Sequence, residues 1–205
     1  MGLLNTIMGR TKPVQANLDA LFGLPSAALT LQSAAGMTLS GRGGVCYKPP
    51  TGQGFEAMQA EVMKLLDREG DCKLRTAEDK FGYHWVVVEN PDIESLVTET
   101  HLINSSLSDS GWGPQLLCSV FGVATLPDDG ASSDAGAPPG PTTVLASTGF
   151  LVYLFKRGTF YPFVPDGKEH RNMEQELKLK SLVANDLTIE TDLDRWFPLW
   201  ELPVG

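Results

Sequence analysis

The chain has 205 residues, of which 42% are hydrophobic and 20% are charged, enough for a domain with a buried core. Its formal net charge of −9 argues against nucleic-acid binding, because phosphate contacts require clustered Lys and Arg. Residues 1–48 carry +3, so the rest of the chain carries −12. This asymmetry fits an ordinary solvated surface, or a basic N-terminal part that contacts an anionic membrane or protein.

The three cysteines are widely spaced and odd in number. Cys46, Cys72 and Cys118 include no CxxC pair, so they do not form the framework of a secreted disulfide-rich protein. Thiols that serve as small apolar side chains suit a reducing compartment. We therefore expect a cytoplasmic protein.

The first residues have a helical apolar pattern. Leu3, Leu4, Ile7 and Met8 fall on one helical face, with polar residues between them. A helix of this length is not stable alone. Residues 1–12 are thus predicted to be an amphipathic tail, which either frays or folds on a bilayer or a partner helix.

The next segments predict short elements. Residues 14–22 fit a short helix closed by Gly23. Ala27–Gln32 and Met37–Ser40 are interpreted as short strands, and Val45–Tyr47 as an extension of the second or a strand after it. The glycine-rich stretch 41–44 is interpreted as a turn, because the strand-to-helix context of a phosphate-binding loop is missing.

The middle of the chain alternates one helix with two strands. Apolar residues at helical spacing predict a helix over 55–66, ended by Gly70. Strands are predicted over 72–76 and 83–89, the second from its β-branched and aromatic residues. Asp92 is the expected N-cap of a helix that extends to Leu107. The apolar run 116–123 predicts a strand covered on both faces.

A segment without core-forming residues separates this strand from a hairpin. Residues 127–143 are almost all Gly, Pro, Ala, Ser and Asp, a composition that predicts a flexible loop inserted between two adjacent strands. The following run, TGFLVYLFKRGTFYPFVP, predicts a β-hairpin that turns at Gly158.

The last elements are a helix and an aromatic tail. A helix is expected near 169–184, with Met173, Leu177 and Leu182 as its contacts, followed by a short strand over 187–189. Trp196 and Trp200, so close to the end, suggest a tail docked on the body. Strand pairs joined by short turns predict an α+β fold. We expect a single domain over 1–205, with one mainly antiparallel sheet flanked by about four helices.

A search for catalytic and metal-binding motifs finds no complete one. The HExxH, GxxxxGK[ST] and GxSxG patterns are absent, and His84, His101 and His170 are isolated. Glu174, Glu176 and Glu190 are interpreted as solvated charges. No metal, cofactor or catalytic residue is predicted.

Several segments resemble one known family. The stretches 82–89 (GYHWVVVE), 155–165 (FKRGTFYPFVP), 176–179 (ELKL) and 196–200 (WFPLW) are similar to the PspAB family, whose members are associated with phage-shock protein A. The opening residues and 21–24 (LFGL) share this likeness, which covers most of the chain and weakens over 39–54 and 127–143. The resemblance implies a cytoplasmic partner protein in the envelope-stress response, whose target is a coiled-coil protein that coats the inner membrane. The missing HExxH argues against the protease label that some relatives carry, and no catalytic residue is transferred.

Three functions from different classes are compatible with these observations. The first is a non-enzymatic adaptor that binds a phage-shock protein A-like partner, with an undetermined oligomeric state. The second is a hydrolase with a site near His84, which requires a pocket and a carboxylate there. The third is a peripheral membrane protein that uses Leu3, Leu4, Ile7 and Met8. For the adaptor, the predicted contact residues are Tyr83, His84, Trp85, Arg157, Tyr161, Arg195, Trp196 and Trp200.

Overall fold

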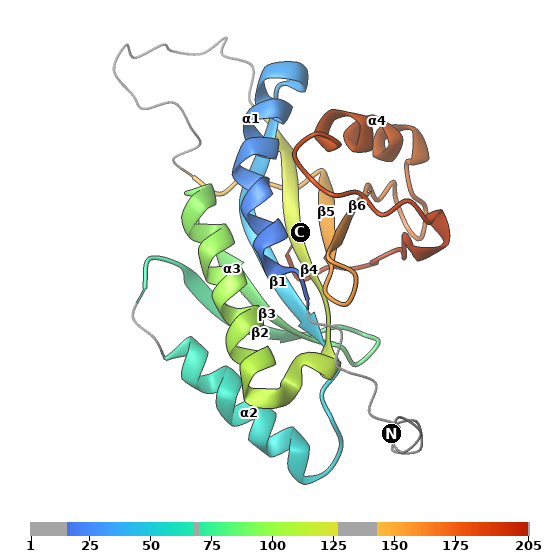
Figure 1. Ribbon diagram of the computed structural model, residues 1–205. Helices are drawn as coiled ribbons and strands as arrows, with labels where there is room; N and C mark the ends of the chain where they lie inside the picture. Colours follow the sequence, from blue (N-terminus) through green and yellow to red (C-terminus); the bar gives the residue numbers. More distant parts are fainter. Residues whose placement is uncertain (1–15, 68–69, 127–142, 205) are drawn as a thin grey trace, which may run out of the picture.

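A six-stranded antiparallel sheet forms the centre of the computed structural model, which describes residues 16–67, 70–126 and 143–204 (Figure 1). Its spatial order is β2-β3-β1-β4-β5-β6. The strands are β1 (Met37–Tyr47), β2 (Lys73–Glu78), β3 (His84–Glu89), β4 (Leu116–Thr125), β5 (Gly149–Leu154) and β6 (Thr159–Phe163). The α-helices are α1 (Leu24–Ala35), α2 (Gln53–Leu66), α3 (Ile93–Leu107) and α4 (Met173–Val183). The predicted α+β class is therefore confirmed.

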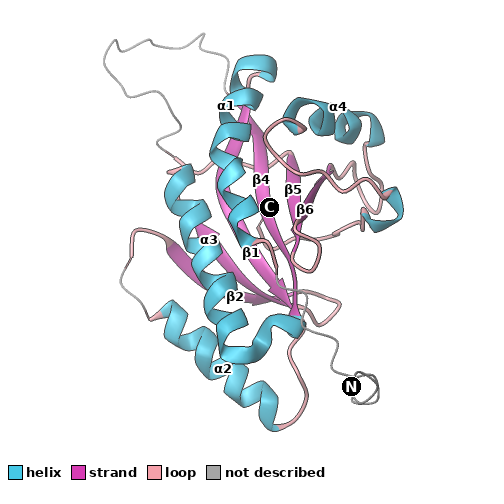
Figure 2. Ribbon diagram, viewed as in Figure 1, coloured by secondary structure: helices cyan, strands magenta, loops and turns pink. Residues whose placement is uncertain are grey.

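The sheet buries both of its faces, but against different partners. Along β3, Val86 and Val88 belong to a first core with residues of α1, α2 and α3, and these helices lie on one side of the sheet (Figure 2). Trp85 and Val87 alternate with them and belong to a second core. No α-helix of the described residues contributes to this second core. The C-terminal segment, which we define as residues 196–204, covers it instead.

The predicted hairpin is confirmed, and so is the prediction that the strands before and after residues 127–143 are adjacent in the sheet. β5 and β6 pair antiparallel, and Gly158 has a φ of 69°, which a residue without Cβ adopts at little cost. β4 pairs directly with β5, so the segment between them does join adjacent strands. Most of the predicted loop at 127–143, and the whole predicted tail at 1–12, lie outside the described residues.

The strand predicted over Ala27–Gln32 is wrong, because this stretch belongs to α1. Its buried residues, Leu24, Ala27, Ala28 and Leu31, have the i, i+3, i+4, i+7 spacing of a helix. Gly36 ends α1 in the left-handed conformation, with a φ of 61°. The preceding residues form a 3-10 helix, Leu18–Gly23, which leads directly into α1.

The turn predicted at 41–44 is also wrong, since β1 runs through it without a break. The pairing of β1 with β4 shifts register between Leu39 and Gly43, which indicates a β-bulge that absorbs the glycine-rich stretch. Gly41 has a φ of 81°. A Cβ there would lie 2.9 Å from the Asn90 carbonyl oxygen, so the close strand approach favours glycine.

The last helix forms as α4, and of its three predicted contact residues only Leu182 packs against the core. Met173 and Leu177 are exposed, whereas Leu179 and Val183 are buried. Glu176 is also fully buried, because its carboxylate accepts hydrogen bonds from the Arg171 side chain and the Val164 amide. The strand predicted over 187–189 is reduced to a single bridge between Ile189 and Phe160.

Candidate functional site

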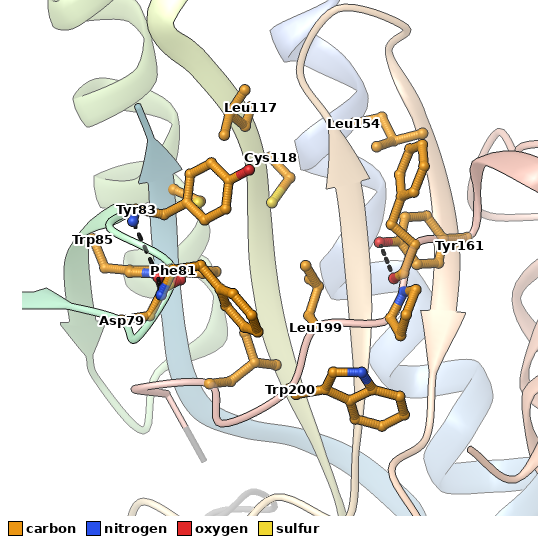
Figure 3. Close-up of a pocket in the computed structure, with 14 residues that line it drawn as sticks. Asp79, Phe81, Tyr83, Trp85, Leu117, Cys118, Leu154, Tyr161, Leu199 and Trp200 are labelled. Atoms are coloured by element: carbon orange, nitrogen blue, oxygen red, sulfur yellow. Dashed lines mark hydrogen bonds between the residues drawn. The ribbon is translucent and has the colours of Figure 1, made fainter. Parts of the chain in front are cut away.

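A pocket of about 420 Å³ lies between the second face of the sheet and the C-terminal segment (Figure 3). Five strands supply its floor, among them β1 through Cys46, β4 through Cys118 and β6 through Tyr161. The turn between β2 and β3 forms one side, and the C-terminal segment forms the other. The remaining lining residues are mostly apolar or aromatic: Asp79, Phe81, Tyr83, Trp85, Leu117, Leu154, Phe197, Pro198, Leu199, Trp200 and Leu202.

The turn side of the pocket is organised by Asp79. Its Oδ1 accepts hydrogen bonds from the Phe81 and Tyr83 amides at 2.9 and 3.0 Å. Its Oδ2 accepts from Trp85 Nε1 at 3.0 Å. The Asp79 carboxylate thus orders the turn and links it to Trp85 on the pocket floor. It also places an acidic group within an aromatic lining.

Hydrogen bonds at Trp196 and Phe197 attach the start of the C-terminal segment to the rest of the domain. Tyr161 donates its hydroxyl to the Phe197 carbonyl at 2.8 Å, the dashed line on the β6 side of Figure 3. Trp196 Nε1 donates to the Glu190 carbonyl at 3.0 Å, and Trp196 is 2% exposed. The predicted docking of the tail on the body is therefore confirmed.

A glycine in β1 allows the far end of the segment to approach. A Cβ on Gly44 would lie 2.9 Å from Val204 Cγ1, so a larger residue there would push the segment away from the sheet. Arg75 Nη2 also donates to the Pro203 carbonyl at 2.6 Å, and Lys80 pairs with Glu201. The pocket is the space that remains among these attachments.

Two phenylalanines make the mouth of the pocket apolar. Phe81, on the turn, is 57% exposed, and Phe197, on the C-terminal segment, is 55% exposed. Figure 3 shows Phe81 and Tyr83 on one side of the pocket, with Tyr161 and Trp200 across from them. Exposed aromatic residues around an apolar cavity are typical of interaction sites.

Two ionisable groups on the floor, Cys46 and Tyr161, are kept neutral. Cys46 and Cys118 are directly opposite each other on β1 and β4. A hydrogen bond with Cys118, together with burial, raises the pKa of the Cys46 thiol. Burial also raises the pKa of Tyr161. At neutral pH Cys46 and Tyr161 therefore present protonated groups, which suit binding better than nucleophilic attack.

The pocket is not the one that the hydrolase hypothesis requires around His84. His84 contacts the rings of Tyr47 and Phe55, on the face of the sheet that the helices cover. Its Nε2 lies 3.8 Å from Glu78 Oε2. Within residues 16–67, 70–126 and 143–204, no three His, Cys, Asp or Glu side chains gather as a metal site would require.

The predicted partner-contact residues fall into three groups. Trp85, Tyr161 and Trp196 are buried in the second core, and the first two also line the pocket. Tyr83 and Trp200 are partly buried and line the pocket. His84, Arg157 and Arg195 lie outside its lining.

Arg157 has a structural partner. Its Nε lies 2.6 Å from Glu190 Oε2, and Thr159 donates to the same oxygen at 3.0 Å. The Glu190 side chain is 1% exposed, so its interpretation as a solvated charge is wrong, as it is for Glu176. Both glutamates are buried because an arginine neutralises each of them.

Sequence reasoning missed Asp79, Phe81 and Phe197. Asp79 and Phe81 fall in or beside a polar stretch between two strands, where a turn is the natural interpretation, and Phe197 lies among other aromatic residues. A usable signal was the Asp79-x-Phe81-Gly82 pattern, because aspartate often accepts hydrogen bonds from the amides of a turn that it begins.

Comparison with known proteins places the chain in a family. The model of the family described as PspA associated protein B, PspAB, matches residues 1–204. The chain belongs to the PspAB family. No curated protein and no solved structure matches it. In the described part of this PspAB protein, every helix falls short of the length and apolar character needed to cross a bilayer.

Proposed function

We propose that this PspAB protein is a non-enzymatic adaptor that binds a phage-shock protein A-like coiled-coil protein in the cytoplasm, as part of the envelope-stress response. The observation that carries the proposal is the apolar pocket with Phe81 and Phe197 at its mouth. The family description, PspA associated protein B, supplies the partner. Apolar side chains of a helix would insert at this mouth, a common mode of helix recognition.

The chemistry of the lining supports binding rather than catalysis. Both oxygens of Asp79 already accept hydrogen bonds from the protein's own groups, and the Tyr161 hydroxyl is donated to Phe197. An ionised carboxylate offers about four acceptor positions, so Asp79 keeps one, on Oδ2, for a donor brought by a partner. The other positions hold the turn and the indole of Trp85 in place, which suits a binding surface.

The test is a binding titration with purified phage-shock protein A. We expect Phe81→Ser and Phe197→Ser each to weaken the Kd by about tenfold or more, as aromatic anchors at interface centres do. Leu29→Ser is the matched control, because Leu29 is 68% exposed but lies on α1, across the sheet from the pocket. It should leave the Kd unchanged.

Two results would refute the proposal. One is a wild-type protein that does not bind phage-shock protein A. The other is a loss of affinity as large in the Leu29→Ser control as in the mouth variants. Thermal unfolding of each variant shows whether its fold is intact. The variants Trp196→Ala and Arg157→Glu are less suitable, since Trp196 is buried and Arg157 neutralises a buried glutamate.

A further inference from the structure

We propose that the pocket receives an arginine side chain of the partner, whose guanidinium pairs with Asp79 while its stem lies against the aromatic walls. This inference rests on the proposed function and specifies the chemistry of the partner's anchor. Three properties support it: the charge of Asp79, the aromatic lining of the pocket and the net charge of the whole chain.

The first property is that the Asp79 carboxylate forms no ion pair within the described part of the chain. Asp79 takes part in none of the ion pairs found among the described residues. Its neighbour Lys80 is directed to Glu201, with Nζ 2.6 Å from Oε1. The three hydrogen bonds to Asp79 come from neutral amide and indole groups, so they stabilise its negative charge without neutralising it. A cation from outside would neutralise it.

The second property is the aromatic lining. Phe81, Tyr83 and Trp85 line the pocket on the side of Asp79, and Trp200 lines it from across the cavity. A guanidinium is planar and weakly hydrated, and it stacks on aromatic faces while it pairs with a carboxylate. Its three-carbon stem gains from apolar contact. An arginine side chain can therefore stack on the aromatic residues and pair with Asp79. An aliphatic side chain can contact the aromatic residues but cannot pair with the carboxylate.

The third property is the charge of the molecule. The net charge of −9 produces a field that attracts a basic helix and repels an acidic one. An anionic ligand is disfavoured at the pocket itself, because it would approach Asp79. The preferred partner surface is consequently an amphipathic helix with an arginine beside its apolar residues.

The test uses three small probes of similar size on the wild-type protein. They are N-acetyl-arginine N-methylamide, its citrulline counterpart, which replaces the guanidinium by an uncharged urea, and its norleucine counterpart. Binding is followed through the indole N–H signal of Trp85 in ¹H–¹⁵N spectra, since this group donates to Asp79. Trp112, which packs against the first core, is the internal control.

We expect the arginine probe to shift the Trp85 signal saturably and to bind about tenfold more tightly than the citrulline probe, without a shift of Trp112. Asp79→Asn should remove that preference, and Phe81→Leu should reduce it while the pocket stays apolar. Equal binding of arginine and citrulline, tighter binding of norleucine, or an unmoved Trp85 signal in the wild type would overturn the inference.

The probe titration and the titration with phage-shock protein A test different claims, so either claim can be refuted without the other. A protein that binds the arginine probe but not phage-shock protein A would refute the proposed function alone. A protein that binds phage-shock protein A but shows no preference for arginine would refute the inference alone.

Discussion

Two buried carboxylates help to hold the chain that follows β6 against the sheet. Glu176 neutralises Arg171, which also donates to the Trp196 carbonyl at 2.7 Å. Glu190 neutralises Arg157 and accepts a hydrogen bond from Thr159. Removing one partner of such a pair leaves a buried charge that water cannot reach, and that is far more costly than losing a surface pair.

The Arg157–Glu190 pair gives a prediction at this scale. Arg157→Ala should lower the free energy of unfolding by about 3 kcal/mol, because the Glu190 carboxylate stays buried without its cation. Arg195→Ala is the control, since the Arg195–Asp192 pair is 45% exposed on both sides and should cost less than about 1 kcal/mol. Urea denaturation at neutral pH measures both. Equal effects of the two substitutions would show that Glu190 finds other compensation.

At the scale of the elements, α3 has a start fixed by a side-chain cap. Asp92 accepts a hydrogen bond from the Ser95 amide at 2.8 Å, as the sequence predicts for an N-cap. The hydrogen bonds from Ser95 hold the pKa of Asp92 below its usual value. The folded state therefore binds the proton of Asp92 less tightly than the unfolded chain does.

This cap predicts a pH-dependent loss of stability. Asp92→Ala should cost about 1 kcal/mol at pH 7. Because the folded-state pKa lies below the unfolded value, the contribution of the charge is complete above the unfolded pKa. It is lost as the pH falls through the folded pKa. The difference in unfolding free energy between Asp92→Ala and the wild type should therefore shrink in acid. A constant difference down to the lowest pH at which the protein folds would contradict this account.

At the scale of the whole molecule, the two faces of the sheet are covered by different kinds of structure. Helices α1, α2 and α3, together with Leu179 and Val183 of α4, bury one face. The other depends on a segment without α-helix that contributes Trp196 and Val204 to the second core. The pocket exists because this thin cover does not fill the space above the sheet. A thicker cover, such as a packed helix, would leave no such cavity.

Removing the C-terminal segment should therefore expose the second core. A chain that ends at residue 195 should bind an apolar dye such as ANS at 25 °C and melt at a lower temperature, because Val87, Val120 and Phe163 lose their cover. Phe197→Ser in the full chain is the control and should bind little dye, since Phe197 is already 55% exposed. A truncated chain with an unchanged melting temperature and no dye binding would mean that the segment is not part of the core.

Local patterns allowed much of the fold to be predicted. The hairpin at Gly158, the strand over 116–123, the cap at Asp92 and the α+β class all follow from short-range chemistry: turn geometry, β-branched runs and capping side chains. The errors at 27–32 and 41–44 have local causes as well. A short apolar run has no decisive period, and a glycine-rich stretch fits a bulged strand as well as a turn.

The sequence alone determined most of the backbone elements, because their signals lie within a few residues of one another. It also allowed the family to be recognised. Only the tertiary structure decided which charges are buried and where the pocket lies. Glu190 meets Arg157, and Asp79 comes to share a cavity with Trp200, through pairings of strands and a tail far apart in the chain. No local pattern encodes such contacts, since they depend on how the two faces of the sheet are covered.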